Sequence, residues 1–384
     1  MNTRNVVISM LFVIAVAAAT TVLVELRPRN ANSNASSTTT APGTTNTTSG
    51  QLPPATSMSQ GDGPGLARSF GSTLVGHLAG SMTGGLATYS HFAYTNIDNQ
   101  AYVIDIQNPS LPTPVGFFDT GERFNNLTIA GTYAYVTKGG ILFSGAVIKA
   151  RVDIYSLANP QAPKKVGEFE DQAANAFGFS HVYVTGTMAY ITDGDDQVYA
   201  LDVSDPNRPT RVSVYDAQQQ SGAATGITGR GNYLYVAQGG PGIVVVDATN
   251  HANLKTVTVI NTPGYPESLA ISGSTLFVAD FEGGGMMSFD ISNPAKPRQL
   301  GQQYATPNDF GGPRFVRLTN NRVLGISSLG LTVFNIHQPS KLLPLTTIGT
   351  DGVPPPSFGA AIQGDYLYTI NDTVGMFVFA INGL

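Results

Sequence analysis

The chain contains neither cysteine nor tryptophan among its 384 residues. Without cysteine it can form neither a disulfide framework nor a thiolate metal site, so its stability must come from packing alone. The absence of tryptophan argues against a quinone cofactor stacked on that ring, and against the usual sugar-stacking platform.

Charged residues are also scarce, at 12% of the chain, which is about half of the roughly 25% usual in globular proteins. The net charge is −5 at pH 7, and no block of lysine and arginine occurs. A nucleic-acid partner would require a basic face, so this composition argues against one. Hydrophobic residues make up 42%, enough for a sizeable core.

The N-terminal segment, residues 1–29, contains an uncharged run from Val6 to Val24. A helix over this run would span roughly 28 Å at about 1.5 Å per residue, close to the thickness of a bilayer core. The small residues Ala17 to Ala19 are typical of a secretory cleavage site. The apolar run continues beyond them, which favours a retained anchor. Charge does not settle the orientation of an anchor, because Arg4 and the free amine on one side roughly match Arg27 and Arg29 on the other. We expect the rest of the chain to lie outside the cytoplasm.

Residues 30–70 are rich in serine, threonine and asparagine, with few large apolar side chains. Such a segment cannot bury enough surface to fold, so we expect a flexible stalk, with O-glycosylation where serine and threonine accompany proline. Four N-glycosylation sequons occur, two in this stalk (Asn34 and Asn46) and two in the region that follows (Asn126 and Asn371).

Residues 71–384 repeat one unit. Its landmark is an alternating apolar strand that ends at an aspartate before an Asn/Asp-Pro turn. The landmark position is held by Asp105, Ser156, Asp202, Asp247, Asp290, Asn335 and Ala380. A period near 45 residues with period-two alternation is typical of a propeller blade of four antiparallel strands. We expect the recurring aspartate to cap the turn through its side-chain oxygens rather than to act in catalysis.

The two ends of the repeat region predict how the propeller closes. Ser72–Leu78 reads as a fourth strand with no preceding three, and the last unit ends after a third strand at Met376–Ile381. We therefore predict an all-β, seven-bladed β-propeller in which the N-terminal strand completes the last blade, so that no sheet edge is left open. Six or eight blades remain alternatives, because the second unit is irregular, with an insertion around Ile141–Arg151.

These units resemble LVIVD repeats, named for the third strand and its aspartate. Matching stretches are Tyr-Val-Ile-Asp105, Tyr-Ala-Leu-Asp202, Val-Val-Val-Asp247 and Asp290-Ile-Ser-Asn-Pro-Ala-Lys-Pro297. The second, sixth and last units depart from the pattern at the aspartate. The resemblance implies a propeller of a kind common on bacterial and archaeal surfaces, and it implies no shared catalytic residues.

Sequence variation between the units points to one face as the candidate binding surface. The long, variable loops are those from fourth to first strand, and function concentrates where loops vary on a rigid scaffold. We expect a site at the mouth of the central channel, formed by Asn126, Phe179, His181, Tyr265, Glu267, Arg314 and Phe358. The alternative is that most of these aromatic rings pack between blades.

The other sequence signals for a metal or catalytic site are weak. Asp193, Asp195 and Asp196 are oxygen-rich enough for calcium but lack the spaced bidentate glutamate of an EF-hand loop, and a hairpin turn explains them better. The five histidines show no paired metal spacing. No nucleophile elbow or phosphate-binding loop occurs. We expect no metal and no cofactor.

The sequence therefore predicts a non-enzymatic, membrane-anchored protein of the cell surface. Its expected partner is another surface protein or a second copy of itself, with a glycan as the second choice. The alternative is an extracytoplasmic hydrolase or lyase with Glu267, His181 and Arg314 clustered at the channel mouth.

Overall fold

The structure is a computed structural model. It describes residues 73–97, 100–121, 124–141, 147–171, 178–216, 224–240, 242–281, 285–303, 315–319, 322–327, 330–335, 337–342, 344–348 and 359–381. This part of the chain is all-β, and it contains no helix that could span a membrane. The predicted signal or anchor (1–29) and stalk (30–70) lie outside the described residues.

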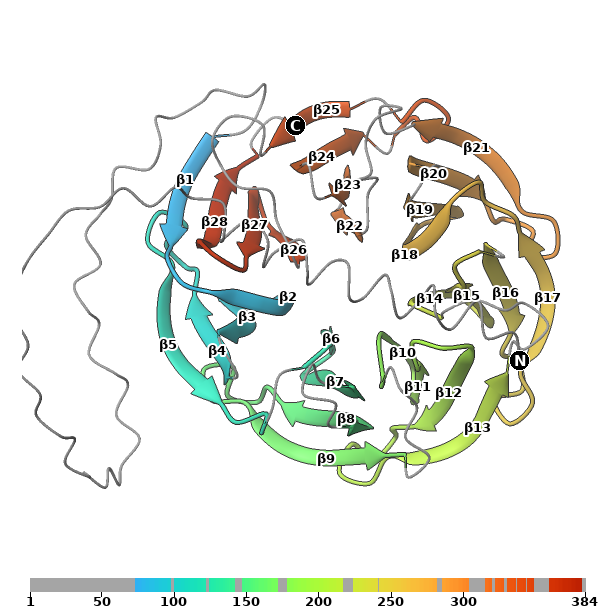
Figure 1. Cartoon of the computed structure of the whole chain (residues 1–384), viewed down its shortest axis with the longest axis horizontal. Coiled ribbons are helices and arrows are strands. Elements are labelled where there is room, and N and C mark those ends of the chain that lie inside the picture. The colour runs from blue at the N-terminus through green and yellow to red at the C-terminus, as the bar shows by residue number, and fades with distance from the viewer. Residues whose placement is uncertain are drawn as a thin grey trace, which may run out of the picture. The chain divides into compact units, whose positions relative to one another are not determined.

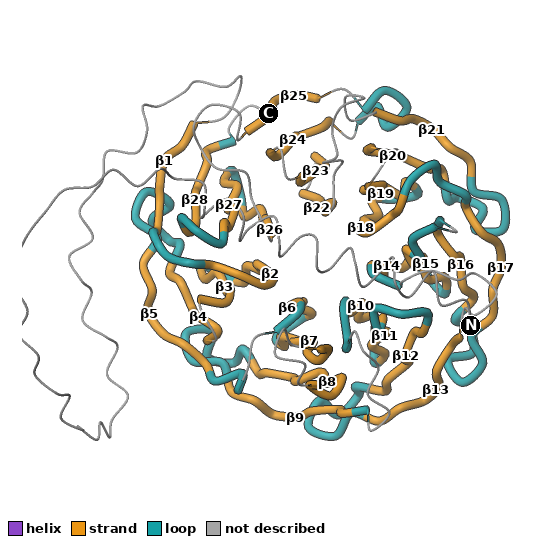
Figure 2. The backbone as a smooth tube through the Cα atoms, viewed as in Figure 1, coloured by secondary structure: helices purple, strands orange, loops and turns teal. Residues whose placement is uncertain are grey.

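The strands form seven four-stranded antiparallel sheets arranged as blades around a centre (Figures 1 and 2). Blades 1 to 3 consist of β2 (Met82–Tyr89), β3 (Phe92–Ile97), β4 (Gln100–Asp105) and β5 (Thr113–Phe118); β6 (Asn126–Ala130), β7 (Tyr133–Ile141), β8 (Val147–Ser156) and β9 (Lys164–Glu170); and β10 (Val182–Thr185), β11 (Met188–Thr192), β12 (Gln197–Asp202) and β13 (Thr210–Asp216). Blades 4 to 6 consist of β14 (Gly226–Arg230), β15 (Tyr233–Ala237), β16 (Ile243–Asp247) and β17 (Lys255–Ile260); β18 (Tyr265–Ser272), β19 (Thr275–Phe281), β20 (Gly285–Asp290) and β21 (Arg298–Gln303); and β22 (Phe315–Thr319), β23 (Arg322–Ser327), β24 (Gly330–Asn335) and β25 (Pro344–Ile348). Blade 7 consists of β26 (Gly359–Gln363), β27 (Tyr366–Asn371), β28 (Gly375–Ala380) and β1 (Thr73–Leu78).

Blade 7 confirms the predicted closure. Strand β1 pairs antiparallel with β28, from Thr73 opposite Ala380 to Leu78 opposite Met376. The His77 ring stacks on Phe377 with centroids 4.5 Å apart, and His77 Nε2 lies 2.8 Å from the backbone oxygen of Val374. Because the first strand completes the last sheet, the ring closes with four strands in every blade.

The irregular second unit adds no extra blade. Its insertion lies where β7 and β8 form an elongated hairpin, and these two strands remain partners within one four-stranded sheet. The prediction of seven blades is thus confirmed against six or eight.

The recurring aspartate caps the third turn of its blade, as predicted. Asp105, Asp202, Asp247 and Asp290 each accept a hydrogen bond at Oδ1 from the backbone nitrogen two residues later, at 2.8 to 2.9 Å. Hydrogen bonds from the residue two positions later, from its side chain as well as its backbone nitrogen, lower the pKa of Asp202, Asp247 and Asp290. The next asparagine or aspartate repeats the device just before the proline, as at Asn293, whose Oδ1 accepts from Ala295 N at 3.1 Å.

The hydrophobic core is divided among the interfaces between blades. Each buried cluster joins residues of two adjacent blades, and together the clusters run around the whole ring. In blade 1 a row of opposed residues, Tyr94, Val103 and Gly116, spans three strands and faces blade 2. The Tyr94 hydroxyl donates to the backbone oxygen of Pro160 in the turn of blade 2, at 2.8 Å.

The glycine of this row is a steric requirement. The equivalent glycines are Gly76, Gly116, Gly167 and Gly301, and a side-chain carbon at any of them would lie under 3.0 Å from a turn carbonyl oxygen of the next blade. In these four blades glycine therefore allows that turn to seat against the sheet. The Val/Leu-Gly pair in the fourth strand is the sequence sign of this contact between blades.

Candidate functional site

The channel end predicted as the site brings together residues from consecutive blades. His181, Thr225 and Glu267 precede or begin the inner part of blades 3, 4 and 5. The Thr225 hydroxyl lies within hydrogen-bond distance of the backbone oxygens of Pro266 (3.4 Å) and Glu267 (3.3 Å). Thr128 Oγ1 donates in the same way to Val182 O at 3.3 Å. These polar groups link neighbouring blades.

His181 is a strongly perturbed titratable group at this end. Both of its ring nitrogens are buried and make no geometrically sound hydrogen bond within the described residues, although the Thr225 backbone lies near the ring. Burial, together with the positive charge of Arg317 on β22, lowers the pKa of His181 to about 4. The imidazole is therefore neutral at physiological pH.

The predicted aromatic residues of the site differ in their environment. Phe179 is 0% exposed, stacks on Phe169 with centroids 6.2 Å apart and contacts Tyr199 edge-on, so it packs in the core between blades 2 and 3. The ring of Tyr265 lies directly over Gly239, at the turn between β15 and β16. Arg314 and Phe358 lie outside the described residues.

The acidic turn at Asp193 is stabilised internally. Asp193 Oδ1 accepts hydrogen bonds from the backbone nitrogens of Asp195 and Gln197, both at 3.0 Å. Burial, with Asp216 nearby, raises the pKa of Asp195, and Asp196 shifts in the same direction. No grouping of histidine and acidic side chains suited to a metal ion occurs in the described part of the chain.

The two sequons of the folded region have enclosed asparagines. Asn126 is 9% and Asn371 5% exposed. Asn371 Oδ1 accepts from Thr373 N at 2.9 Å and from Thr373 Oγ1 at 2.8 Å, which shapes the turn between β27 and β28. A glycan on either residue would have to displace the side chain from this position.

Blade 2 contains a buried ionic cluster that the sequence did not single out. Lys138, 0% exposed, donates to Asp153 and to the backbone oxygen of Thr120. Asp153 Oδ1 also lies 3.0 Å from Arg151 Nε and 2.9 Å from Lys165 Nζ. Three cations thus surround one buried carboxylate and connect β7, β8 and β9.

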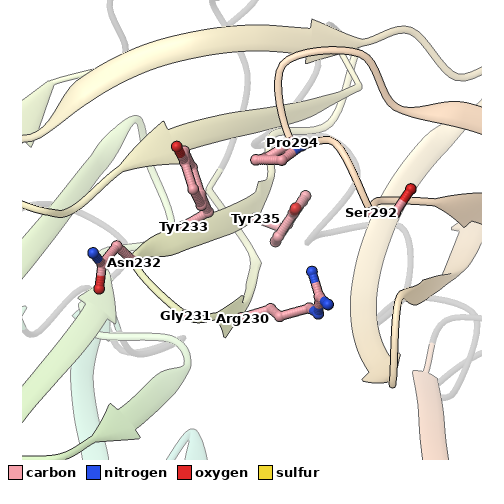
Figure 3. A pocket seen from close by; sticks show the side chains of 7 residues that line it. All are labelled: Arg230, Gly231, Asn232, Tyr233, Tyr235, Ser292 and Pro294. Carbon is pink, nitrogen blue, oxygen red and sulfur yellow. The ribbon is translucent and has the colours of Figure 1, made fainter.

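A pocket of about 520 Å³ opens between blades 4 and 5, on the face opposite the predicted site. It is lined by Arg230, Gly231, Asn232, Tyr233 and Tyr235 of blade 4 and by Ser292 and Pro294 in the third turn of blade 5 (Figure 3). Sequence reasoning missed it because these turns are short. The available signal was Arg230, the only arginine among the residues that directly precede the first turn of each blade.

The closed ring of four-stranded blades, with loop faces at its two ends, defines a β-propeller. The LVIVD repeat model matches residues 80–120, 180–217, 221–262 and 263–306. These segments contain the four units whose landmark is aspartate, so the chain is an LVIVD-repeat β-propeller. The three units expected to be weaker copies are the ones the repeat model does not match.

Solved structures share the fold at low identity. The designed protein Ika8 is 10% identical with a TM-score of 0.56, covering 80% of this chain and 98% of its own. Raptor from Chaetomium thermophilum is 12% identical with a TM-score of 0.62, and the match covers 82% of this chain and 30% of Raptor. BamB from Moraxella catarrhalis is 14% identical with a TM-score of 0.50, covering 83% and 92%. No curated protein sequence matches the chain.

Proposed function

We propose that this propeller is a non-enzymatic interaction module of the cell surface, which uses its long-loop face to bind another surface protein or a second copy of itself. The observation that carries the proposal is the unequal variation of the two faces. The third turns of blades 1 to 5, 106–112, 157–163, 203–209, 248–254 and 291–297, have one common length, and that of blade 6, 336–343, is one residue longer. The loops between blades vary widely, from 261–264 to 171–181 and 304–314. A uniform scaffold with one variable face is typical of a binding protein.

The described residues at the channel end make contacts that order the loops. The ring nitrogens of His181 are buried and make no geometrically sound hydrogen bond in the described part of the chain, and burial together with the charge of Arg317 lowers the pKa of His181. Asp280, whose pKa burial raises to about 6, accepts bonds from Gly264 N (2.9 Å) and Thr262 Oγ1 (3.1 Å) and so orders the loop 261–264. The hydrolase or lyase alternative needs Arg314 beside His181 and Glu267, and Arg314 lies outside the described residues.

Site-specific photo-crosslinking tests the proposal. A benzophenone amino acid replaces Asn261, exposed on the long-loop face, or Gln107, exposed in a third turn on the opposite face. After irradiation of intact cells, mass spectrometry identifies the linked chains. We expect one specific partner, or a second copy of this chain, from position 261 and not from 107. Equal products from both positions, or none from either, would refute the loop face as the interaction surface.

A further inference from the structure

The pocket between blades 4 and 5 lies where the packing row lacks the glycine found in blades 1, 2, 5 and 7. Blades 3 and 6 also lack it, with Ser213 and Thr346 at that position. The row of blade 4 is Tyr235, Val245 and Thr258, the counterpart of Tyr94, Val103 and Gly116 in blade 1. A side-chain carbon at the glycine position would collide with the next turn in four other blades. With threonine there, the turn at Pro294 cannot seat as the turn at Pro160 does.

Blade 3 shows what fills such a gap elsewhere. Its row ends in Ser213, also larger than glycine, and the Ser213 hydroxyl donates to His251 O at 2.6 Å. The His251 imidazole occupies the space, with Nδ1 2.7 Å from the Tyr190 hydroxyl. In blade 5 the position of His251 is held by Pro294, which has no polar side chain to reach Tyr235. The gap therefore remains open as the pocket.

The pocket is lined by the hydroxyl-bearing side chain of Tyr235. The residue as a whole is 1% exposed, but its hydroxyl is not among the buried polar atoms that lack a partner in the described part of the chain, so we take it to open onto the pocket. Burial raises the pKa of Tyr235 to about 12, so the hydroxyl keeps its proton and can donate or accept. A hydroxyl that faces a pocket can hydrogen-bond to a ligand there.

Arg230 adds a positive charge at the rim. It lies directly opposite Tyr233 in the pairing of β14 with β15, so both side chains stand on the face that Tyr235 shares (Figure 3). Arg230 belongs to none of the ion pairs found among the described residues. An exposed guanidinium beside a concave surface is suited to a carboxylate, which it can bind with two parallel hydrogen bonds.

We propose that this pocket binds a hexuronic acid residue of an acidic glycan, with the sugar carboxylate on Arg230 and its hydroxyls on Tyr235, Tyr233 and Ser292. Hydroxyl groups both donate and accept, which matches the hydroxyls of a sugar, whereas arginine only donates, which matches a carboxylate. The tyrosine rings offer apolar faces to the sugar ring. The volume of about 520 Å³ falls within the range of roughly 300–1,000 Å³ typical of small-ligand sites.

The pocket lies on the face opposite the long loops, so this inference is independent of the proposed protein partner. The probes are disaccharides of glucuronic acid and of galacturonic acid, with cellobiose as the neutral match and an Asp/Glu-rich peptide as the second carboxylate source. Binding to the full chain is measured by isothermal titration calorimetry. We expect both acidic disaccharides to bind and cellobiose to bind about tenfold or more weakly, because it lacks the charge-assisted contact.

Two substitutions locate the site. Arg230→Gln removes the charge and Tyr235→Phe removes only the hydroxyl, and each should weaken the acidic disaccharides by about tenfold. Arg208→Gln, an exposed arginine in the third turn of blade 3, should leave affinity unchanged, and circular dichroism confirms that each variant is folded.

Thr258→Gly provides a separate test, since it should let the Pro294 turn approach the sheet and close the pocket. Loss of disaccharide binding in this folded variant would support the assignment. The inference is overturned if neither acidic disaccharide binds, if cellobiose binds equally well, if the peptide alone binds, or if Arg208→Gln weakens binding as much as Arg230→Gln.

Discussion

Replacing Gly167 by alanine tests how neighbouring blades fit together. Gly167 lies on β9, opposite Ile154, and faces the turn of blade 3. A side-chain carbon there would meet the backbone oxygen of Pro206, and under 3.0 Å something must shift. Because that oxygen belongs to the backbone of a capped turn, no side-chain rotation can relieve the clash. The whole turn, fixed by the bond from Asn207 N to Asp205 Oδ1 at 3.0 Å, would have to move.

Overpacking of this kind costs about 1–3 kcal/mol. The change also restricts the unfolded chain, which returns about 0.4–1 kcal/mol. We therefore expect Gly167→Ala to lower the free energy of unfolding by roughly 1–2 kcal/mol. The matched control is Gly240→Ala, because a carbon at Gly240 meets nothing within 4 Å.

The two variants are unfolded in urea, and the transition is followed by circular dichroism and by tyrosine fluorescence, because the chain lacks tryptophan. If the dependence of the free energy of unfolding on urea concentration is the same in both, the urea midpoints compare their stabilities directly. A midpoint for Gly167→Ala equal to or above that of Gly240→Ala would refute the close approach between blades.

Three further predictions concern buried charge. The pKa of His181 is lowered from 6.5 to about 4 in the folded chain, so between these values the unfolded chain binds more protons. The free energy of unfolding therefore rises with pH across that window, by about 3 kcal/mol. The variant His181→Gln should flatten this rise in urea titrations from pH 4 to 7, and an unchanged pH dependence would count against the burial of the ring. Asp280 has the opposite effect on the pH dependence of stability, because its pKa is raised from 3.8 to about 6. Its contribution to the free energy of unfolding therefore falls as pH increases through that window. The variant Asp280→Asn should remove this fall in the same titration. The variant Asp153→Asn leaves Lys138 buried without its counter-charge and should destabilise the fold by about 3–5 kcal/mol. The control Glu168→Gln, at an exposed carboxylate, should change stability by no more than about 1 kcal/mol. Equal urea-unfolding midpoints for these two variants would contradict the buried cluster.

The repeat and its caps were predictable because they depend on local chemistry. An aspartate two residues before a backbone nitrogen, followed by Asn-Pro, forms the same turn wherever it occurs, as at Asp202 and Asp290. Strand closure was also predictable, since an unpaired fourth strand at the start matches a missing one at the end. These inferences need only spacing along the chain.

The candidate sites were harder to predict, because they depend on which blade faces which. Phe179 and His181 are two residues apart, yet one ring packs in the core and the other lies at the channel end near Arg317. The pocket depends on Thr258 of one blade and Pro294 of the next, and no periodicity within a unit relates these two positions.

By itself, the sequence determined the all-β class, the period of the blade, the capped turns and the way the ring closes. Each of these follows from alternation, turn chemistry and the match between the unpaired first strand and the incomplete last unit. Only the tertiary structure decided which side chains are buried and where a pocket remains between two blades. That outcome depends on steric fit across an interface, where exchanging one glycine for a threonine changes whether a neighbouring backbone can seat.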